Sequence, residues 1–369
     1  GCFLLHRMPE YKRTICLEFF GNDIAEAVPA VVEVKQMLDT NPDVLLTGLE
    51  HLDERYIKAV KYTTKASQAG YSHAGRSVDD SYIGRPKMVL LADITSDDER
   101  AVQAAAEEVV DVSKKRNGQG FIAVSAEARK RFWLDRARTA AISAHTNAFK
   151  INEDVVIPLP RLAEYNRGIE CINIRQSITN KIQICTAIIR YLDSDLKDTA
   201  EDDSYTTSRE AEEIVINKCA TAKKLIEQKK QHWSDILEHL DGYARENIDL
   251  LLGHEQARIR ENDRLIDLLL RRDCIISYTD EIHRPLTEIF SGQDLEPVRE
   301  KFKQIHLEIK DSKLFVALHM HAGDGNVHTN IPVHSENYAM LHEADKVVDQ
   351  IMALAQSLDG AISGEHGIG

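Results

Sequence analysis

Cysteine is sparse in this chain, and no two cysteines are closely spaced. The 369 residues contain six cysteines, and none of them forms a CxxC pair. This spacing argues against an iron–sulfur cluster or a structural zinc site held by the chain's own cysteines. Scattered cysteines in a chain of this length are more often reduced core residues. The pattern therefore predicts a cytoplasmic protein, with peripheral association with the inner membrane as the alternative.

An excess of positive charge and long apolar runs are absent as well. The chain has 46 Lys and Arg residues against 60 Asp and Glu residues, and its formal net charge is −14. Phosphate contacts need a surplus of lysine and arginine, so we predict no nucleic-acid partner. No apolar run reaches the length of a membrane-spanning helix, and the first seven residues are too short and wrongly flanked for a secretory signal. An apolar content of 43% supports a core, and the length suffices for two domains.

Strand and helix patterns alternate in the first part of the chain. Residues 11–20 and 87–94 are dense in apolar side chains and predict buried strands. Residues 24–38 and 96–115 follow capping residues and predict helices. This order, with the strands far apart in the sequence, predicts an α+β fold with a ferredoxin-like antiparallel sheet and helices on one face.

A long segment of different composition interrupts this pattern. It is rich in glutamate, lysine, leucine and isoleucine, and apolar residues recur at helical spacing as Ile226, Trp233, Ile236, Leu240 and Tyr243, and as Leu265, Leu268, Leu269 and Ile275. Such stripes predict long amphipathic helices that pack as hairpins. We therefore predict an all-helical insertion at 161–311, between a first part of the α+β domain at 1–160 and its last part at 312–369.

Histidines and glycines are concentrated near the end of the chain. Residues 314–320 predict a strand, which leads into a glycine-rich turn that carries His321 and His328. A last helix is followed by Glu365 and His366 between glycines. Two imidazoles and a carboxylate are a common ligand set for a divalent metal. A further imidazole is suited to moving protons at neutral pH.

The glycines of this region have two interpretations. Glycines at positions 323, 325, 364, 367 and 369 would let the backbone approach a ligand closely. The alternative is a tight hairpin whose polar side chains only satisfy backbone groups.

A basic helix-like stretch offers a binding site for an anion. Trp133 and Arg136 are three residues apart, so they share a helix face. Arginine grips a carboxylate through two parallel hydrogen bonds, and Arg138 is a weaker candidate for the same role. Spacing alone favours the alternative, a surface arginine. Residues 148–158 then predict a strand that contains Lys150 and ends at a proline.

The strings HAGDGNVH at 321–328 and SGEHGIG at 363–369 resemble the C-terminal signature of the flavin-linked 2-hydroxy-acid dehydrogenases. That family includes D-lactate dehydrogenase, the glycolate oxidase D subunit and D-2-hydroxyglutarate dehydrogenase, within the vanillyl-alcohol-oxidase type of flavoproteins. The resemblance implies that the α+β domain is a cap over the flavin. It also implies oxidation of a D-2-hydroxy acid to the 2-oxo acid, with hydride transfer to FAD.

The resemblance further implies which residues form the site. They are His321, His328 and Glu365 as ligands of zinc or manganese, His366 as catalytic base, and Arg136, Lys150 and Asn330 as substrate-binding residues. The hydroxyglutarate enzymes carry a threonine one helical turn after the arginine, where this chain has Ala140 and, one position off, Thr139. This departure favours a small substrate such as lactate or glycolate over a dicarboxylic acid.

The glycine-rich flavin-binding half of that family is not found in the chain. We therefore expect FAD to be bound mostly by a separate flavin-binding domain, and the chain alone to be inactive. One alternative is a non-catalytic cap or docking module of a larger flavin and iron–sulfur oxidoreductase, whose helical insertion meets an electron-transfer module or subunit. A metal-dependent hydrolase is a further alternative, but it leaves Arg136 and the paired motifs unexplained.

Overall fold

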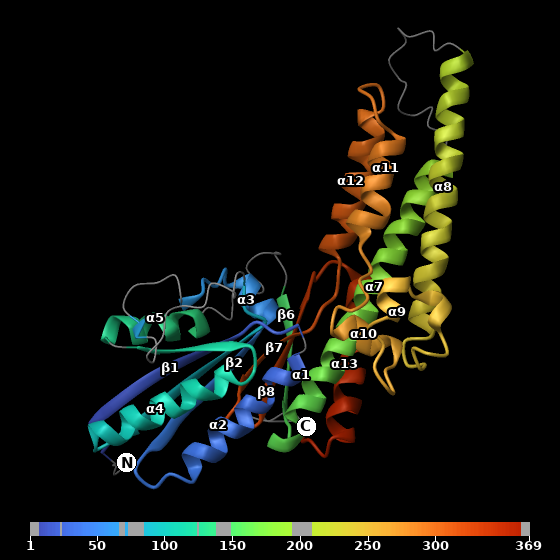
Figure 1. Ribbon diagram of the computed structural model, residues 1–369. Coiled ribbons are helices and arrows are strands. Elements are labelled where there is room, and N and C mark those ends of the chain that lie inside the picture. The colour runs from blue at the N-terminus through green and yellow to red at the C-terminus, as the bar shows by residue number, and fades with distance from the viewer. Residues whose placement is uncertain are drawn as a thin grey trace. The chain divides into compact units, whose positions relative to one another are not determined.

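The computed structural model describes residues 7–22, 24–65, 71–72, 85–123, 125–137, 149–193 and 209–362 of the chain (Figure 1). The chain divides into two compact units. The first consists of Gly1–Ile172 and Leu314–Gly369, and the second of Asn173–Lys313. The second unit is thus contained within the first along the sequence.

The first unit is built on one sheet of eight strands in which every pairing is antiparallel. The strands are β1 (Tyr11–Phe19), β2 (Leu45–Asp53), β3 (Tyr71–Ser72), β4 (Met88–Ser96), β5 (Gly118–Ala123), β6 (Phe149–Val156), β7 (Ala317–His321) and β8 (Asn326–Val333). Their spatial order is β3-β5-β1-β4-β2-β7-β8-β6. The predicted α+β class with an antiparallel sheet is confirmed.

Four of these strands, in the order β5-β1-β4-β2, form the ferredoxin-like part of the sheet. Helix α2 (Pro29–Asp39), preceded by the short α1 (Ile24–Ala27), connects β1 to β2, and α4 (Glu99–Lys114) connects β4 to β5. Each connection links two parallel strands with one antiparallel strand between them, which is the split βαβ arrangement.

Residues from both ends of the first unit complete the sheet. Strands β7 and β8 form a hairpin, and β7 pairs with β2. Strand β6 pairs with β8 along its whole length, from Phe149↔Val333 to Val156↔Asn326. The chain segments before and after the second unit therefore share one sheet.

One face of the sheet carries the larger apolar core. Alternate residues of a strand share a face, and Ile15, Leu17 and Phe19 of β1 all lie in this core. Helices α2, α4, α13 (Tyr338–Ser357) and the start of α7 (Leu162–Asp193) pack on it.

The opposite face carries a smaller apolar cluster together with polar groups. The cluster includes Cys16, Leu52 and Phe121 from the strands and Tyr56 and Phe132 from helices α3 (Glu54–Ala59) and α5 (Ala126–Ala137). These two helices extend the helical cover to the second face. Strand β4 is buried at all nine of its positions, as expected of a central strand covered on both sides.

The second unit is helical, and the predicted helical segment is confirmed. Its main elements are the end of α7, α8 (Arg209–Glu238), η5 (Ile248–Leu250), α9 (Gly253–Gln256), α10 (Leu265–Leu270), the π-helical turn η6 (Thr279–His283), α11 (Arg284–Ile289) and α12 (Glu296–Asp311). Within it Ile226, Trp233 and Leu240 are buried. Tyr243 and Ile275 are instead exposed, because α8 ends at Glu238 and α10 at Leu270, before these positions are reached.

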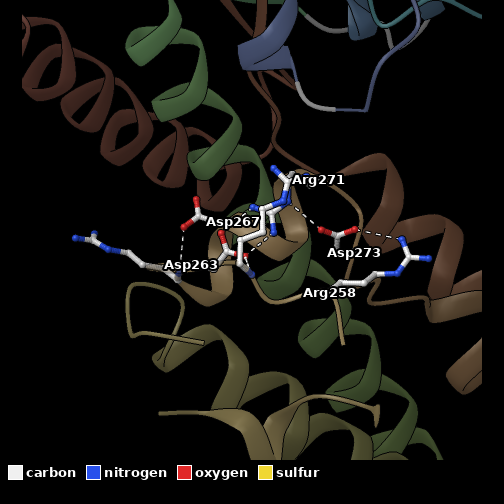
Figure 2. A network of polar contacts seen from close by, with 7 residues as sticks. Arg258, Asp263, Asp267, Arg271 and Asp273 are labelled. Carbon is white, nitrogen blue, oxygen red and sulfur yellow. Dashed lines mark hydrogen bonds and ion pairs between the residues drawn. The ribbon is translucent and has the colours of Figure 1, made fainter. Parts of the chain in front are cut away.

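An ion-pair network braces the irregular region around α10 (Figure 2). Arg271 binds Asp263 through both terminal nitrogens, at 2.9 and 2.6 Å, and its Nε lies 2.9 Å from Asp273. The Asp263 carboxylate also accepts the backbone N–H of Arg260 at 2.7 Å. These contacts hold the pKa of Asp263 below its usual range, although its partial burial acts the other way. Bidentate pairing of this kind has a fixed geometry, so the network orders a segment that has little regular secondary structure.

A tight turn at residues 322–325 joins β7 to β8. Gly325 has a φ of +71°, and a Cβ added there would lie 2.2 Å from the carbonyl oxygen of Ile157. The carbonyl of Gly325 accepts the N–H of Ile157 at 2.8 Å. At Gly323 an added Cβ would meet only the Cβ of Leu49, at 3.5 Å. The predicted need for glycine is therefore a backbone requirement at Gly325, whereas Gly323 has room for a side chain.

We expect Gly325→Ala to lower the free energy of unfolding by roughly 2–4 kcal/mol, because the left-handed φ and the clash with Ile157 act together. Gly323→Ala in the same turn is the matched control and should change it by less than about 1 kcal/mol. Urea unfolding of the two variants measures both values. Equal effects would contradict the assignment of the strained position to Gly325.

Candidate functional site

Polar side chains cross one face of the sheet on strands β2, β7, β8 and β6. They are Glu50, Lys150, Asn152, Asp154, His319, His321, His328 and Asn330, and we call this set the polar stripe. The strand register places Glu50 opposite His321, and His319 opposite His328. Asp154 lies opposite His328 on its other side. Because side chains alternate between the faces of a strand, these groups share one face.

The prediction that His321 and His328 lie together in one glycine-rich turn is wrong in detail. His321 is the last residue of β7, and His328 is the third residue of β8. The turn between them closes within residues 322–325, and both histidines belong to paired strands. The sheet therefore determines their geometry more rigidly than a loop would.

His321 is oriented by a carboxylate. Its Nδ1 lies 2.8 Å from Oε1 of Glu50, and the two side chains are 38% and 12% exposed. A carboxylate accepts hydrogen bonds, so Nδ1 carries the hydrogen of a neutral ring and Nε2 carries the lone pair. The lone pair that can bind an electrophile is thus on the ring nitrogen away from Glu50.

His328 lies between two other imidazoles. Its ring centroid is 5.3 Å from that of His321 in an edge-to-face arrangement, and 4.7 Å from that of His319 in a stacked one. His328 and His319 are 5% and 7% exposed. Three imidazoles, two of them buried and one partly exposed, thus lie in ring contact, and imidazole is a side chain that binds cations or moves protons.

Behind these rings, α3 supplies a buried tyrosine. The Tyr56 hydroxyl lies 2.9 Å from Nδ1 of His319, and Nδ2 of Asn330 lies 3.2 Å from the same nitrogen. Tyr56 and Asn330 are both fully buried. The inner end of the polar stripe is therefore closed by hydrogen bonds between α3, β7 and β8.

Asp53 fixes α3 against β7. Its Oδ1 accepts the N–H of Tyr56 at 2.8 Å as the N-cap of α3, and its Oδ2 accepts the N–H of Leu318 at 2.7 Å. Burial raises the pKa of Asp53 to about 6. Arg55 opposes this rise from 3.9 Å, but it is occupied by Glu170, to which it donates at 2.5 and 3.0 Å.

The other two substrate-binding candidates lie on β6 and α5. Lys150 is the second residue of β6, and its register partner is Pro332. Arg136 belongs to α5, and its side chain lies outside the described residues. Helix α5 reaches the same face as the polar stripe, because a Cβ added at Gly48 of β2 would lie 3.6 Å from Cη2 of Trp133.

Glu365 and His366 lie outside the described residues. Over the part of the chain that the structure describes, no group of three or more His, Cys, Asp or Glu side chains has a metal-binding arrangement. Of the expected ligand set, the described residues thus contain the two imidazoles and no third ligand. The full ligand set therefore stays a prediction.

A family model described as FAD linked oxidases, C-terminal domain, matches residues 8–186 and 292–369. The chain belongs to this family. A comparison with curated proteins gives no match. The internal segment of this FAD-linked oxidase domain that the family model leaves unmatched, 187–291, falls within the helical second unit. Among the described helices, none is both long enough and apolar enough to cross a membrane.

Membership in the family implies FAD as the cofactor. The polar stripe also contains side chains of the type that bind a divalent metal. Imidazole nitrogens are good ligands for zinc and manganese. A metal-binding histidine usually donates its second ring N–H to a carboxylate, and Glu50 is placed to accept that hydrogen from His321. The described residues therefore supply two imidazole donors of the kind that such an ion takes.

Sequence reasoning missed four residues of this site. Glu50, Asp53, Tyr56 and His319 were not among the predicted site residues. The alternation His319-x-His321 was a signal for two imidazoles on one strand face. Glu50 and Tyr56 carried no comparable signal, because they approach the histidines only through the pairing of β2 with β7.

The raised pKa of Asp53 predicts a dependence of stability on pH. Between about pH 4 and pH 6, the unfolded chain loses the Asp53 proton while the folded protein keeps it. The free energy of unfolding should therefore fall as the pH rises through this range. Asp53→Asn should remove that fall, because the amide does not titrate.

Urea unfolding at several pH values measures the difference in free energy of unfolding between the wild-type protein and Asp53→Asn. The exposed Asp345→Asn on α13 is the control and should keep the wild-type pH profile. If the wild-type protein instead becomes more stable relative to Asp53→Asn as the pH rises, the raised pKa of Asp53 is wrong.

Proposed function

We propose that this FAD-linked oxidase domain serves the oxidation of a D-2-hydroxy acid, of the lactate or glycolate kind, to the 2-oxo acid. The observation that carries the proposal is the contact of the His321 and His328 rings on the polar stripe, with Nδ1 of His321 held by Glu50. The strings HAGDGNVH and SGEHGIG, which resemble the signature of enzymes with this activity, support it from the sequence.

His321, His328 and Glu365 are the proposed ligands of a divalent metal, zinc or manganese. Bound there, the metal would supply a Lewis acid that lowers the pKa of the substrate hydroxyl. His321 would present Nε2, because Glu50 engages its Nδ1. The burial of His328 limits the access of competing water to this ligand.

Arg136 and Lys150 are the proposed partners of the substrate carboxylate. A guanidinium and an ammonium together neutralise the carboxylate, and the planar guanidinium also orients it. Asn330, at the buried inner end of the polar stripe, is proposed to contact the substrate as well. Ala140 stands where related dicarboxylic-acid enzymes carry threonine, and this departure in the sequence favours a small substrate.

Oxidation removes two hydrogens from the substrate. FAD supplies the acceptor for the hydride that leaves C2. His366 is the proposed base for the hydroxyl proton, since imidazole titrates near neutral pH. With these two acceptors, the alcohol carbon becomes a carbonyl and both hydrogens are accounted for.

A second proposal concerns the helical unit. We propose that 161–311 is an inserted domain that docks a partner, either the flavin-binding domain or an electron-transfer, iron–sulfur module or subunit. Its support is that the family model leaves 187–291 unmatched. In the alternative function, the whole chain is a non-catalytic cap or docking module, and the histidines do not take part in turnover.

The variants His328→Ala and His366→Asn separate the proposed roles in the protein with FAD bound. His328→Ala should lose metal and turnover together. His366→Asn should keep the metal and lose turnover by on the order of a hundredfold or more, because only the base is removed. Metal analysis beside single-turnover flavin reduction measures both quantities.

His342→Ala, at an exposed position of α13, is the control and should keep both metal and turnover. Equal metal loss in His328→Ala and His366→Asn would make His366 a ligand. Full turnover in both variants would favour the docking-module alternative.

Glu50→Gln tests the orientation of His321. The variant keeps the shape of the side chain and removes the charge that holds the Nδ1 hydrogen, so affinity for zinc or manganese should fall by about ten- to a hundredfold. Titration calorimetry of the variant against the exposed Glu336→Gln control measures this loss. Unchanged affinity in Glu50→Gln would show that His321 does not depend on Glu50 for metal binding.

A further inference from the structure

The helical second unit contains a pocket that the proposed reaction does not use. Residues of η6 and α11 line one side of it and residues of α12 the other (Figure 1). All of the lining residues belong to the second unit. The volume of the pocket is about 180 Å³, below the roughly 300–1,000 Å³ of pockets that hold drug-sized ligands. The pocket therefore fits a small ligand.

The buried part of the pocket lining is apolar. Tyr278, Leu286 and Phe302 are between 1% and 6% exposed. The Phe302 ring packs edge-to-face on Phe290, with the ring centroids 5.3 Å apart. The ring of His306 lies 4.4 Å from that of Tyr278. These ring contacts hold the lining in place, so a ligand meets a fixed aromatic surface.

A rare backbone element borders the pocket. The π-helical turn η6 begins after Tyr278 and ends at His283, and both of these residues line the pocket. Single π-helical turns occur frequently at functional sites. The position of this turn favours a ligand site over a gap left by imperfect packing.

Arg299 of α12 is held in one orientation by the backbone at the end of α11. Its Nη1 donates to the carbonyl oxygens of Phe290 and Gly292, at 2.5 and 2.6 Å. Both hydrogens of Nη1 are thus used, whereas Nε and Nη2 have no hydrogen-bond partner among the residues that the structure describes. These two nitrogens form one edge of the guanidinium, and such an edge binds a carboxylate through two parallel hydrogen bonds.

The other charged groups of the pocket also favour an anion. Lys303 lines it together with Arg299, and Glu300 is the one acidic residue of the described lining. Lys303 and Glu300 pair at 3.3 Å, but their side chains are 59% and 62% exposed. A pair this exposed is weak, so Lys303 is available to a ligand. Two cations against one carboxylate leave the pocket positive, in a chain whose formal net charge is −14.

We propose that this pocket binds a small organic carboxylate. The carboxylate lies on the Nε–Nη2 edge of Arg299, and the apolar body of the ligand packs against the buried aromatic lining. An inorganic anion leaves that lining uncovered, and a neutral molecule leaves the guanidinium edge unpaired. The site is thus distinct from the one at which the proposed oxidation takes place.

NMR titration of the full chain tests the site, with benzoate as the probe. Benzoate carries a carboxylate on a flat apolar ring and should bind with a dissociation constant on the order of 1 mM or tighter. Binding should shift the ring signals of His283, which the variant His283→Gln assigns. Shifts confined to the histidines of the polar stripe, with none at His283, would place benzoate in the first unit and overturn the proposal.

Two further probes test the class of ligand. Benzamide keeps the ring and lacks the charge, so it should bind about tenfold more weakly than benzoate. Inorganic phosphate keeps the charge and lacks the apolar body, so it should also bind about tenfold more weakly. If either of them binds at His283 as tightly as benzoate, an organic carboxylate is not the preferred ligand and the proposal is wrong.

Two substitutions at exposed positions of α12 should change the affinity in opposite directions. Lys303→Gln removes an attractive charge and should weaken benzoate binding by about two- to fivefold. Glu300→Gln removes a repulsive charge and should strengthen binding by a similar factor. Lys301→Gln, exposed on the same helix and outside the pocket lining, is the matched control and should leave the affinity unchanged. Equal affinities in all three variants would overturn the proposal.

Arg299→Lys tests the guanidinium edge itself. The variant keeps the positive charge and loses the planar pair of donors, so benzoate affinity should fall about tenfold. Urea unfolding shows whether the lost contacts to Phe290 and Gly292 also unfold the variant, in which case the substitutions at the exposed positions decide. A folded Arg299→Lys protein with the wild-type affinity would refute the carboxylate contact at Arg299.

Discussion

One buried carboxylate links the two sequence segments of the first unit, which lie before and after the second unit in the chain. Asp53 caps α3 through Tyr56 and accepts the N–H of Leu318, a residue 265 positions away in the sequence. A buried strand N–H such as that of Leu318 would destabilise the fold if it had no hydrogen-bond acceptor. The contact therefore fixes α3 relative to β7, and with it the position of the Tyr56 hydroxyl behind His319.

The candidate site depends on this contact, because its side chains are brought together by the pairing of strands. Glu50 reaches His321 only because β2 pairs with β7, and His319 meets His328 only because β7 pairs with β8. A shift of one residue in either register would turn every second side chain to the opposite face. The apolar core on the other face opposes such a shift, so the core also stabilises the arrangement of the imidazoles.

Local patterns predicted much of the fold. The strands at 11–20 and 87–94, the helices after them and the helical insertion all appear close to their predicted ranges, because dense apolar runs and caps act within a few residues. Strand β2 was not predicted, since it ends in polar residues that serve the site. The prediction of a buried helix face was wrong for Tyr243 and Ile275. Helices α8 and α10 end before these residues, so helical spacing no longer places them on a shared face.

The sequence by itself determined the family, the residue types of the candidate site and the presence of His321 and His328 near one another, because all of these are local or motif-borne. Only the tertiary structure decided that both histidines lie on paired strands, that Glu50 holds one of them, and that Tyr56 and Asn330 meet at His319. Those contacts join segments far apart in the chain, and strand pairing across such distances depends on the register of the whole sheet rather than on any short stretch of residues.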